Sequence, residues 1–321
     1  MADYLHEGEL TLDNGIRGEM WTVSTANPET FYQAISQPES VPVTEIYAQN
    51  FYPSDDLLRD GEKPPIVVVV PGSMGIAPSH VHKAKLFTDA GFATCLLDPF
   101  GAREVSSTVA NQAQFSFAAS AWDVLATVEA LSRNDRVDPA RIGTQGHSRG
   151  GSAILSAASM LKFSNFEGRM AGAYAAYPWS GQQFLNPDVG DTKVRSVVGD
   201  QDEWCSPQQV QGHMQALRLS GCETSWRIFA GAHHSFDRAT PVEMIAEASV
   251  APGAPTIYIE DDGTCIHPVT GPCAIETQER ELMLYGIKAG YGNRGARLGT
   301  SSDFADQFHV DMMEFWRACF A

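Results

Sequence analysis

The sequence predicts an α/β protein with a mostly parallel central sheet and helices on both of its faces. Two observations support this prediction. Short apolar, β-branched runs such as "IVVVV" (66–70) alternate along the chain with longer segments of helical periodicity. The runs are continuously apolar, which is typical of strands that are buried on both faces. Alternation of such strands with helices favours a parallel sheet between two layers of helices.

The expected elements follow one another from residue 43 onward. Their apolar and β-branched residues predict strands at 43–52, 66–70, 92–98, 141–146, 170–178, 194–200 and 225–231. Helical periodicity predicts helices at 79–91, 113–133, 149–161, 207–219 and 304–320. The first of these helices has Ser79 as its expected N-cap and Gly91 as its stop signal.

We expect a single domain over residues 1–321, with two additions to the alternating pattern. Residues 1–40 are polar and weakly patterned, so we expect an N-terminal extension that lies on the domain. Residues 238–302 interrupt the alternation with a possible two-stranded excursion and a helix near 276–287. A long irregular segment of this kind is typical of a functional lid or insert, and a dimer arm of a homo-oligomer is the alternative. Residues 303–321 form the expected C-terminal helix.

The charge balance excludes two classes of partner. Lys and Arg number 22 against 39 Asp and Glu, which gives a net charge of −17. Such a surface repels phosphate backbones and anionic lipid, so we expect no nucleic acid and no membrane surface as partner. The start, "MADYLHEGELTLDNG", lacks the charged and apolar regions of a signal peptide, and no window approaches the ~18 apolar residues of a membrane span. We therefore expect a cytoplasmic protein.

The cysteines predict free thiols, because none of them forms a CxxC pair. Cys265 and Cys273 flank "IHPVTGP", where a disulfide across the loop and a metal site with His267 stay open as alternatives. Neither spacing fits a common zinc pattern, and we expect no metal and no cofactor. The six cysteines are Cys95, Cys205, Cys222, Cys265, Cys273 and Cys319.

The stretch "GHSRG" (146–150) matches the G-x-S-x-G pattern of a nucleophile held on a tight turn. It follows a predicted strand and precedes a helical run rich in Ala and Ser, which is the context that the pattern requires. Small residues on both sides are needed because the neighbouring elements pass close to the turn. Ser148 is therefore a candidate nucleophile, with a glycine-rich connection as the alternative.

A serine nucleophile needs a base, and the base needs an acid that orients it. In this strand–turn–helix context the acid and then the histidine follow the serine on later strand ends. One later strand ends in "GDQDEWCSP", which offers Asp200, Asp202 and Glu203. The next strand ends in "AGAHHSFD", which offers His233 and His234. The order and the placement of these groups predict a catalytic triad.

An oxyanion hole requires two backbone N–H groups beside the nucleophile. One is expected from Arg149, the residue that follows Ser148. The other is expected from the loop in "VVVVPGSMG", with Ser73 as the first candidate and Met74 as the alternative.

Four stretches resemble the dienelactone hydrolase family, whose members have the α/β-hydrolase fold. They are "PPIVVVVPGSMG", "FATCLLDPFGAR", "VDPARIGTQGHSRGG" and the pair "GDQDEWCSP" with "GAHHSFD", and together they cover about residues 43–240 and the terminal helix. The resemblance implies Ser148 as nucleophile, Asp202 as acid and His234 as base. It also implies an α/β-hydrolase fold in which 238–302 is an insert between the histidine loop and the last helix.

The chain departs from this family in two places. Dienelactone hydrolases proper carry a cysteine nucleophile and a glutamate in the first loop, whereas this chain has Ser148 and the loop Pro71-Gly72-Ser73. We therefore expect a serine hydrolase that cleaves a small-molecule ester or lactone through an acyl-enzyme. A prolyl-oligopeptidase-like peptidase, an acyltransferase and a non-catalytic binding protein of the same fold are the alternatives.

Three residues are candidates for substrate binding. Arg103 lies where the family places an arginine that binds a substrate carboxylate, with a surface ion pair as the alternative. Trp179 and Trp204 lie on predicted strand-end loops, where they line an acyl pocket or pack in the core.

Overall fold

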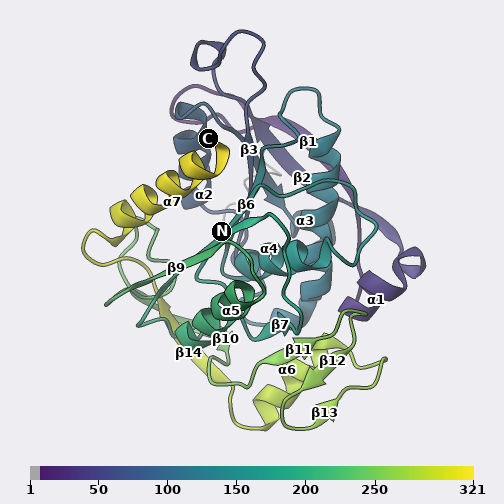
Figure 1. Cartoon of the computed structure of the whole chain (residues 1–321). Coiled ribbons are helices and arrows are strands. Elements are labelled where there is room, and N and C mark those ends of the chain that lie inside the picture. The colour runs from purple at the N-terminus through teal and green to yellow at the C-terminus, as the bar shows by residue number, and fades with distance from the viewer. Residues whose placement is uncertain (1–7) are drawn as a thin grey trace.

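The computed structural model of the chain describes residues 8–321 and has a central sheet of eight strands (Figure 1). The first seven residues lie outside the described residues. They are the start of the expected N-terminal extension and of the stretch searched for a signal peptide. The strand order is β1-β2-β4-β3-β5-β6-β8-β9, in which β2 runs antiparallel to its neighbours β1 and β4 and all other neighbouring pairs are parallel. The bounds are β1 Glu19–Ala26, β2 Val43–Phe51, β3 Ile66–Val70, β4 Ala93–Asp98, β5 Ile142–His147, β6 Gly172–Ala176, β8 Lys193–Gly199 and β9 Thr224–Phe229.

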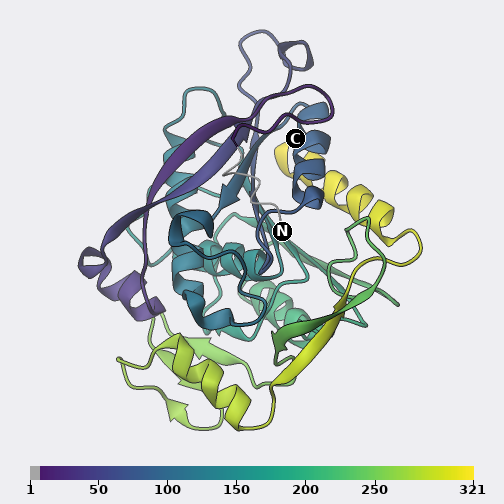
Figure 2. The ribbon, with the colours of Figure 1, turned by 180° about the vertical axis from the view of Figure 1, so that it is seen from behind.

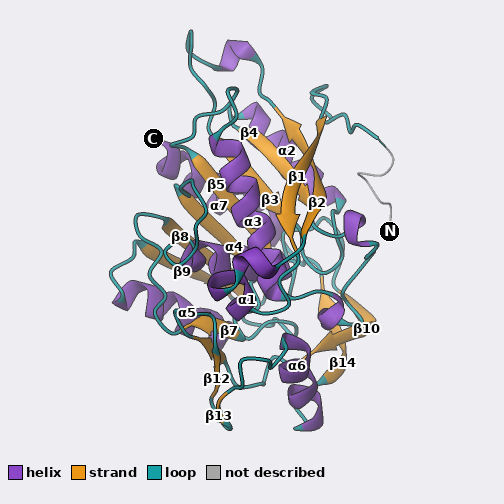
Figure 3. Ribbon diagram, turned by 90° about the vertical axis from the view of Figure 1, so that its right-hand side faces the viewer, coloured by secondary structure: helices purple, strands orange, loops and turns teal. Residues whose placement is uncertain are grey.

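Helices cover both faces of this sheet, as the sequence predicted. Helices α2 (Pro78–Asp89) and α7 (Phe304–Phe320) lie together behind the sheet in Figure 3, where α3 (Phe117–Ser132) and α4 (Arg149–Met160) lie in front of it. A further helix, α5 (Pro207–Leu219), packs against β8 and β9. Within residues 8–321, no helix is long and apolar enough to cross a membrane.

The core follows from the continuous apolar runs. Every residue of β3 and β4 is buried, because helices cover these strands on both sides. Aromatic side chains of α7 fill the space beneath the sheet. A Cβ at Gly143 would lie 2.2 Å from Trp316 Cζ3, so only glycine lets the indole ring lie against β5.

The N-terminal segment differs from the expected extension, because it supplies a strand of the main sheet. Strand β1 pairs with β2 over its full length, from Glu19 opposite Asn50 to Ala26 opposite Val43. A short helix, α1 (Phe31–Ser36), follows it. Only part of β1 is buried, so its sequence lacks the continuous apolar signal of the inner strands.

Helix starts also differ from the sequence predictions by a few residues. Helix α3 begins at Phe117 rather than at 113, because Ser116 Oγ accepts a hydrogen bond from Ala119 N at 2.8 Å and caps the helix there. Helix α2 has Ala77 rather than Ser79 at its N-cap. Four single 3₁₀ turns are Pro38–Ser40, Asp55–Leu57, Gly101–Arg103 and Gln112–Gln114 (η4).

The segment 238–302 is more regular than expected and forms two small sheets and a helix at one end of the molecule (Figures 1 and 2). One sheet pairs β10 with β14, and the other joins β13, β12 and β11 to β7. The bounds are β7 Gln182–Phe184, β10 Glu243–Val250, β11 Ile257–Ile259, β12 Cys265–His267, β13 Gly271–Pro272, α6 Glu279–Lys288 and β14 Asn293–Leu298. Because β11 pairs in parallel with β7, the insert is built onto the domain.

Candidate active site

Ser148 lies on a sharp turn between strand β5 and helix α4. Its backbone has φ +53° and ψ −115°, a conformation that residues with a side chain rarely adopt. The flanking glycines allow the close approach: a Cβ at Gly146 would lie 2.1 Å from Gly150 O, and one at Gly150 would lie 2.3 Å from Val70 O. The G-x-S-x-G pattern therefore has the strained strand–turn–helix geometry that the sequence predicted.

Ser148, His234 and Asp202 form a continuous chain of hydrogen bonds. His234 Nε2 lies 2.9 Å from Ser148 Oγ, and His234 Nδ1 lies 2.7 Å from Asp202 Oδ2. A carboxylate only accepts, so Nδ1 carries the proton and Nε2 of the neutral ring accepts from the serine hydroxyl. Asp202 Oδ1 accepts from the backbone N–H groups of Trp204 and Cys205 at 2.8 and 2.9 Å, which fixes the carboxylate.

The other acids and the other histidine on these loops lie elsewhere. Asp200 Oδ1 accepts from Gly231 N at 2.7 Å, and Glu203 pairs with Arg297. His233 is half-buried, and its Nδ1 has no hydrogen-bond partner among the described residues. Of the alternatives left open by the sequence, the structure brings only Asp202 and His234 to Ser148.

The expected oxyanion-hole residues lie beside the nucleophile. The loop after β3 passes so close that a Cβ at Gly72 would lie 3.1 Å from Ser148 Cβ. Ser73, Arg149 and Ser148 line the large cavity, and a smaller neighbouring cavity is lined by Ser73 and Met74 together with Ser148 and His234. Both candidate residues of the loop thus lie beside the nucleophile, and the role of the amides stays a prediction.

The two terminal nitrogens of the Arg149 side chain form hydrogen bonds inside the protein, whereas its buried Nε has no hydrogen-bond partner among the described residues. Its guanidinium donates to Gln112 O at 2.9 Å, Phe115 O at 2.6 Å and Ser116 O at 3.0 Å, and it lies over the Phe115 and Phe117 rings. Burial lowers the pKa of this guanidinium to about 10, which still leaves it charged at neutral pH. It holds the segment between η4 and α3, rather than reaching toward a substrate.

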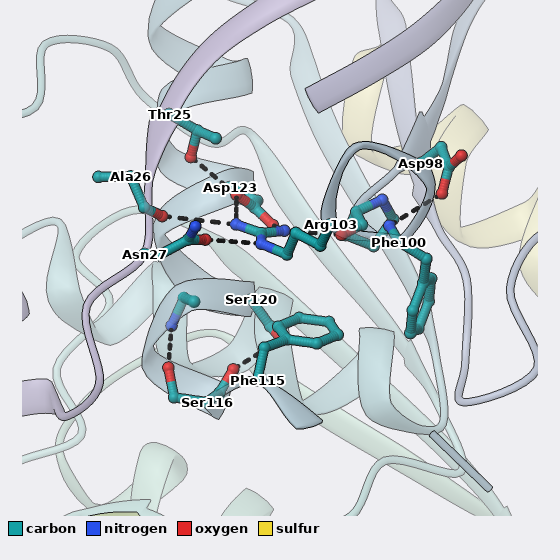
Figure 4. A network of polar contacts seen from close by, with 12 residues as sticks. Thr25, Ala26, Asn27, Asp98, Phe100, Arg103, Phe115, Ser116, Ser120 and Asp123 are labelled. Carbon is teal, nitrogen blue, oxygen red and sulfur yellow. Dashed lines mark hydrogen bonds and ion pairs between the residues drawn. The ribbon is translucent and has the colours of Figure 1, made fainter. Parts of the chain in front are cut away.

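Arg103 lies away from the cavity and makes a buried ion pair (Figure 4). Its guanidinium donates to Asp123 at 2.6 and 2.9 Å, to Asn27 Oδ1 at 2.6 Å and to Pro99 O at 2.7 Å. Burial raises the pKa of Asp123, and the charge of Arg103 opposes that shift. The structure therefore corrects the expectation for Arg103: this arginine ties the N-terminal segment to α3, because Asp123 is its closest counter-charge.

A cavity of about 650 Å³ opens beside Ser148. Its walls come from the loops of the main sheet on one side and from the insert on the other, and they are mostly apolar. Residues that define these walls include Phe117, Trp179, Val250, Ile257, Met283 and Ile287. A cavity of this size and composition is typical of a small-molecule site.

Both candidate tryptophans line this cavity. Trp179 packs against Phe117 with ring centroids 4.6 Å apart. Trp204 stacks on the His234 imidazole at 5.3 Å and 16°, and its indole Nε1 donates to Arg297 O at 2.8 Å. Trp204 therefore contacts the histidine of the triad as well as the cavity.

Strand β14 of the insert and the residue that follows it support the two triad loops, a role that the sequence did not reveal. Gly299 N donates to His234 O at 2.8 Å, and Arg297 N donates to Glu203 Oε2 at 2.8 Å. These contacts join residues far apart in the chain, and no local pattern in 293–298 announces them.

A second buried acid, Asp237, lies behind the triad and was also missed. Lys83 Nζ donates to Asp237 Oδ2 at 2.5 Å, and Tyr177 Oη donates to Asp237 Oδ1 at 2.5 Å. Burial alone would raise the pKa of Asp237, but the Lys83 ammonium, His147 and the hydrogen bonds from Lys83 and Tyr177 together outweigh it and lower this pKa. Burial and the charge of Lys83 lower the pKa of the neighbouring His147 to about 3, so that this ring stays neutral. The "HHSFD" ending of the histidine loop was the available signal.

Within residues 8–321 one group of side chains has the spacing of metal ligands, and it overlaps the triad. Ligand atoms of Asp202, Cys205 and His234 lie within 4.8 Å of one another. The Asp202 oxygens and His234 Nδ1 already make the hydrogen bonds described above, and burial raises the pKa of the Cys205 thiol well above its ordinary value. These observations favour a triad over a metal centre.

The cysteines near residue 270 are free thiols, as the sequence predicted. The β12–β13 register places Cys265 opposite Cys273, and Cys273 N donates to Cys265 O at 2.8 Å. His267 Nδ1 accepts from Val269 N and Thr270 N, each at 3.2 Å, so this nitrogen is not free for a metal.

Comparisons with known proteins agree with this fold. A dienelactone hydrolase-like promiscuous phosphotriesterase from metagenomic libraries is 13% identical, with a TM-score of 0.54, 95% of this chain covered and 100% of that chain covered. A puromycin-hydrolysing peptidase of Mycobacterium tuberculosis is 17% identical, with a TM-score of 0.50, and the match covers 70% of this chain and 37% of that one. No curated protein sequence matches the chain. At these identities the solved structures show the fold alone.

The family itself follows from the sequence match. The dienelactone hydrolase family matches residues 57–251, which is more than half of the chain and includes Ser148, Asp202 and His234. The main sheet, its helices and the turn that carries Ser148 are those of an α/β-hydrolase fold. The chain is therefore a hydrolase-type α/β protein and belongs to the dienelactone hydrolase family.

Proposed function

We propose that this protein is a serine hydrolase that cleaves a carboxylic ester or a lactone through an acyl-enzyme. The observation that supports the proposal is the hydrogen-bonded chain Ser148–His234–Asp202, with distances of 2.9 and 2.7 Å, beside a mostly apolar cavity of about 650 Å³. A serine becomes a nucleophile when an adjacent, oriented base takes its proton, and this arrangement supplies both groups.

The proposed reaction uses only side chains, backbone amides and water. His234 Nε2 takes the proton of Ser148 Oγ while Oγ attacks the carbonyl carbon, and the amides of Ser73 and Arg149 stabilise the oxyanion. His234 then gives the proton to the leaving alcohol as the carbon–oxygen bond breaks. Water, deprotonated by His234, attacks the acyl-enzyme and releases the acid and Ser148. Asp202 keeps the ring oriented and stabilises its charged form throughout.

The cavity walls favour a substrate with a substantial apolar part. Phe117, Trp179 and Met283 offer carbon surface next to Ser148. Each buried methylene of an acyl chain gains about 0.8 kcal/mol from leaving water, so longer acyl chains are favoured until the cavity is filled. We therefore propose esters of medium acyl length, or lactones of similar size, as the substrate class.

The test is hydrolysis of p-nitrophenyl esters from acetate to decanoate by the wild-type protein and by Ser148→Ala. We expect turnover by the wild type and a loss of about 10⁴-fold or more in Ser148→Ala, because the triad acts as a unit. Ser156→Ala is the matched control, since Ser156 lies two turns further along α4 and is only half-buried. Hydrolysis that survives in Ser148→Ala would contradict the proposal.

The same assay separates the related reactions. The panel includes a phosphotriester and puromycin, because the two structural neighbours are named for these substrates. Added alcohol or amine acceptors reveal acyl transfer through the ester that it produces. A folded wild-type protein that turns over only the phosphotriester or puromycin would replace the ester proposal, and one that turns over nothing would favour a binding protein.

A further inference from the structure

Helix α6 of the insert is joined to the main domain by one buried carboxylate. Glu279, the first residue of α6, is only 6% exposed. Its two oxygens accept hydrogen bonds from Phe117 N at 2.6 Å and from Ala118 N at 3.0 Å. A buried, doubly hydrogen-bonded carboxylate is unusual for a residue type that is almost always exposed, so its position calls for a reason.

The contact completes the cap of helix α3. The first N–H groups of a helix have no partner within the helix, and they carry a partial positive charge. Ser116 Oγ satisfies Ala119 N, and Glu279 of the insert satisfies Phe117 N and Ala118 N. Loss of Glu279 would leave two buried donors unpaired, each at a cost of about 1–3 kcal/mol.

This contact lies at the edge of the cavity beside Ser148. Glu279, Met283 and Ile287 of α6 line that cavity, and so does Phe117 of α3. The two helices that the Glu279 contact joins therefore both supply wall residues to the cavity. The hydrogen bonds of the Glu279 carboxyl join α6 to α3 at this point.

The charged and titratable groups around Glu279 come from three elements. Arg149 of α4 lowers the pKa of Glu279, as do the two N–H groups of α3, but burial outweighs them and raises it to about 7. The Cys265 thiol of β12 lies near enough for the Glu279 charge to raise its pKa. On α6 itself, the exposed Arg280 lines the cavity, and Glu281 accepts a hydrogen bond from Gln278 N.

We propose that Glu279 is a positioning residue that sets substrate size: by holding α6 against the N-terminus of α3, it fixes the width of the cavity beside Ser148. The inference rests on the proposed ester hydrolysis and deepens it. Glu279 touches none of the reacting atoms, and it acts through Met283 and Ile287, whose side chains meet the substrate.

The pH dependence of this contact has a definite sign. Burial of Glu279 against α3 raises its pKa from the ordinary 4.5 to about 7. The arrangement with α6 against α3, called closed here, therefore binds the proton more tightly than an open arrangement in which Glu279 is exposed to water. Protonation therefore favours closure. The contact is strongest below pH 4.5, weakens as the pH rises to about 7, and stays at its weaker level above that.

The kinetic test compares wild type with Glu279→Gln and Glu279→Ala at pH 5.5 and pH 8, using the acetate-to-decanoate series. The readout is the ratio of kcat/KM between the best and the worst ester, because the ionisation of the triad cancels in this ratio. We expect the wild-type ratio to be larger at pH 5.5 and the Ala ratio to fall by about tenfold. The Gln ratio should be the same at both pH values and lie between those of wild type and Ala. The Gln amide oxygen accepts from one of the two α3 N–H groups and leaves the other without its partner, but it buries no charge.

A second readout needs no catalysis, which keeps this inference separate from the proposed function. Hydrogen exchange of the α6 amides at a single pH should be faster in Glu279→Ala than in wild type, with an intermediate rate in Glu279→Gln, which keeps one of the two hydrogen bonds. Glu276→Ala is the control, since Glu276 is exposed just before α6. Wild-type exchange and discrimination in Glu279→Ala would overturn the inference, as would a Gln variant as loose as Ala. If the wild-type protein hydrolyses no ester but the α6 amides of Glu279→Ala still exchange faster, the proposed function is rejected. The structural role of the Glu279 contact is then still supported.

Discussion

Side chains that do not belong to the triad help to hold the His234 ring in place, and Tyr177 is the one in direct contact with it. Tyr177 has φ +39°, which is uncommon for a residue this bulky, and its ring lies edge-on to the His234 imidazole with centroids 4.7 Å apart. Strained conformations of this kind persist only where the surroundings enforce them, and they cluster at functional sites. Here the enforcing contacts are those of Asp237 with Tyr177 Oη and Lys83 Nζ.

Replacement of Lys83 tests this network. Lys83→Met removes the ammonium and leaves Asp237 buried without its counter-charge, since both side chains are at most 1% exposed. Breaking a buried pair in this way costs about 3–5 kcal/mol, and we expect a loss of that size in the free energy of urea unfolding. Activity should fall with it, as the Tyr177–His234 contact loosens.

The matched control lies two residues along the same helix. Lys85 pairs with Asp89 at the surface, so Lys85→Met should change the free energy of unfolding by about 1 kcal/mol or less. The double variant Lys83→Met/Asp237→Asn should recover part of the lost stability, because it leaves no buried charge. Equal effects of Lys83→Met and Lys85→Met would show that the buried pair has no such role.

At the scale of elements, the turn between β5 and α4 requires glycine at position 150, because backbone atoms of the neighbouring segment lie too close for a side chain. A Cβ at Gly150 would lie 2.3 Å from Val70 O and 2.5 Å from Pro71 O, which are backbone atoms of the neighbouring loop. Gly150→Ala should therefore push the start of α4 away from the end of β3 and lower the free energy of unfolding by several kcal/mol, about the upper range for single substitutions. The Ser148 hydroxyl would move with the turn, so activity should be lost as well.

A second helical glycine provides the comparison. A Cβ at Gly212, on the exposed side of α5, meets nothing within 4 Å. Gly212→Ala should stabilise the protein by about 0.4–1 kcal/mol, because alanine restricts the unfolded chain and favours the helix. Thermal unfolding of both variants measures the difference. A Gly150→Ala variant as stable as Gly212→Ala would refute the close packing at the turn.

Elements with a strong local signal could be predicted from the sequence. Helices α5 and α7 and strand β3 have the bounds expected from their periodicity and flanking residues. Strand β1 and the three-residue strand β7 were missed, since β1 is only partly buried and β7 is too short to show a period. The start of α3 shifted because a single Ser116 hydrogen bond decides it.

At the scale of the whole molecule, the fold could be predicted, but the insert could not. The order of strands and helices indicated a parallel α/β sheet, and the family match agrees with it. Segment 238–302 takes its structure from contacts with distant parts of the chain, such as β11 with β7 and Gly299 with His234. No local pattern encodes such contacts.

The candidate site divides in the same way. Ser148, Asp202 and His234 were found because their order and strand-end positions are visible in the chain. Arg103 was misjudged because its partner, Asp123, lies on a helix that sequence alone does not place beside it. Glu279 was missed since a glutamate in an irregular, polar segment is ordinarily exposed.

The most direct measurement is labelling of the native protein with a fluorophosphonate, followed by mass spectrometry of the adduct. This reagent reacts with a serine only when a base activates it, so it reports on Ser148 without any assumption about the substrate. We expect one adduct per chain, located on Ser148 and absent from Ser148→Ala. A folded wild-type protein that remains unlabelled, or a label that persists in Ser148→Ala, would show that Ser148 is not an activated nucleophile.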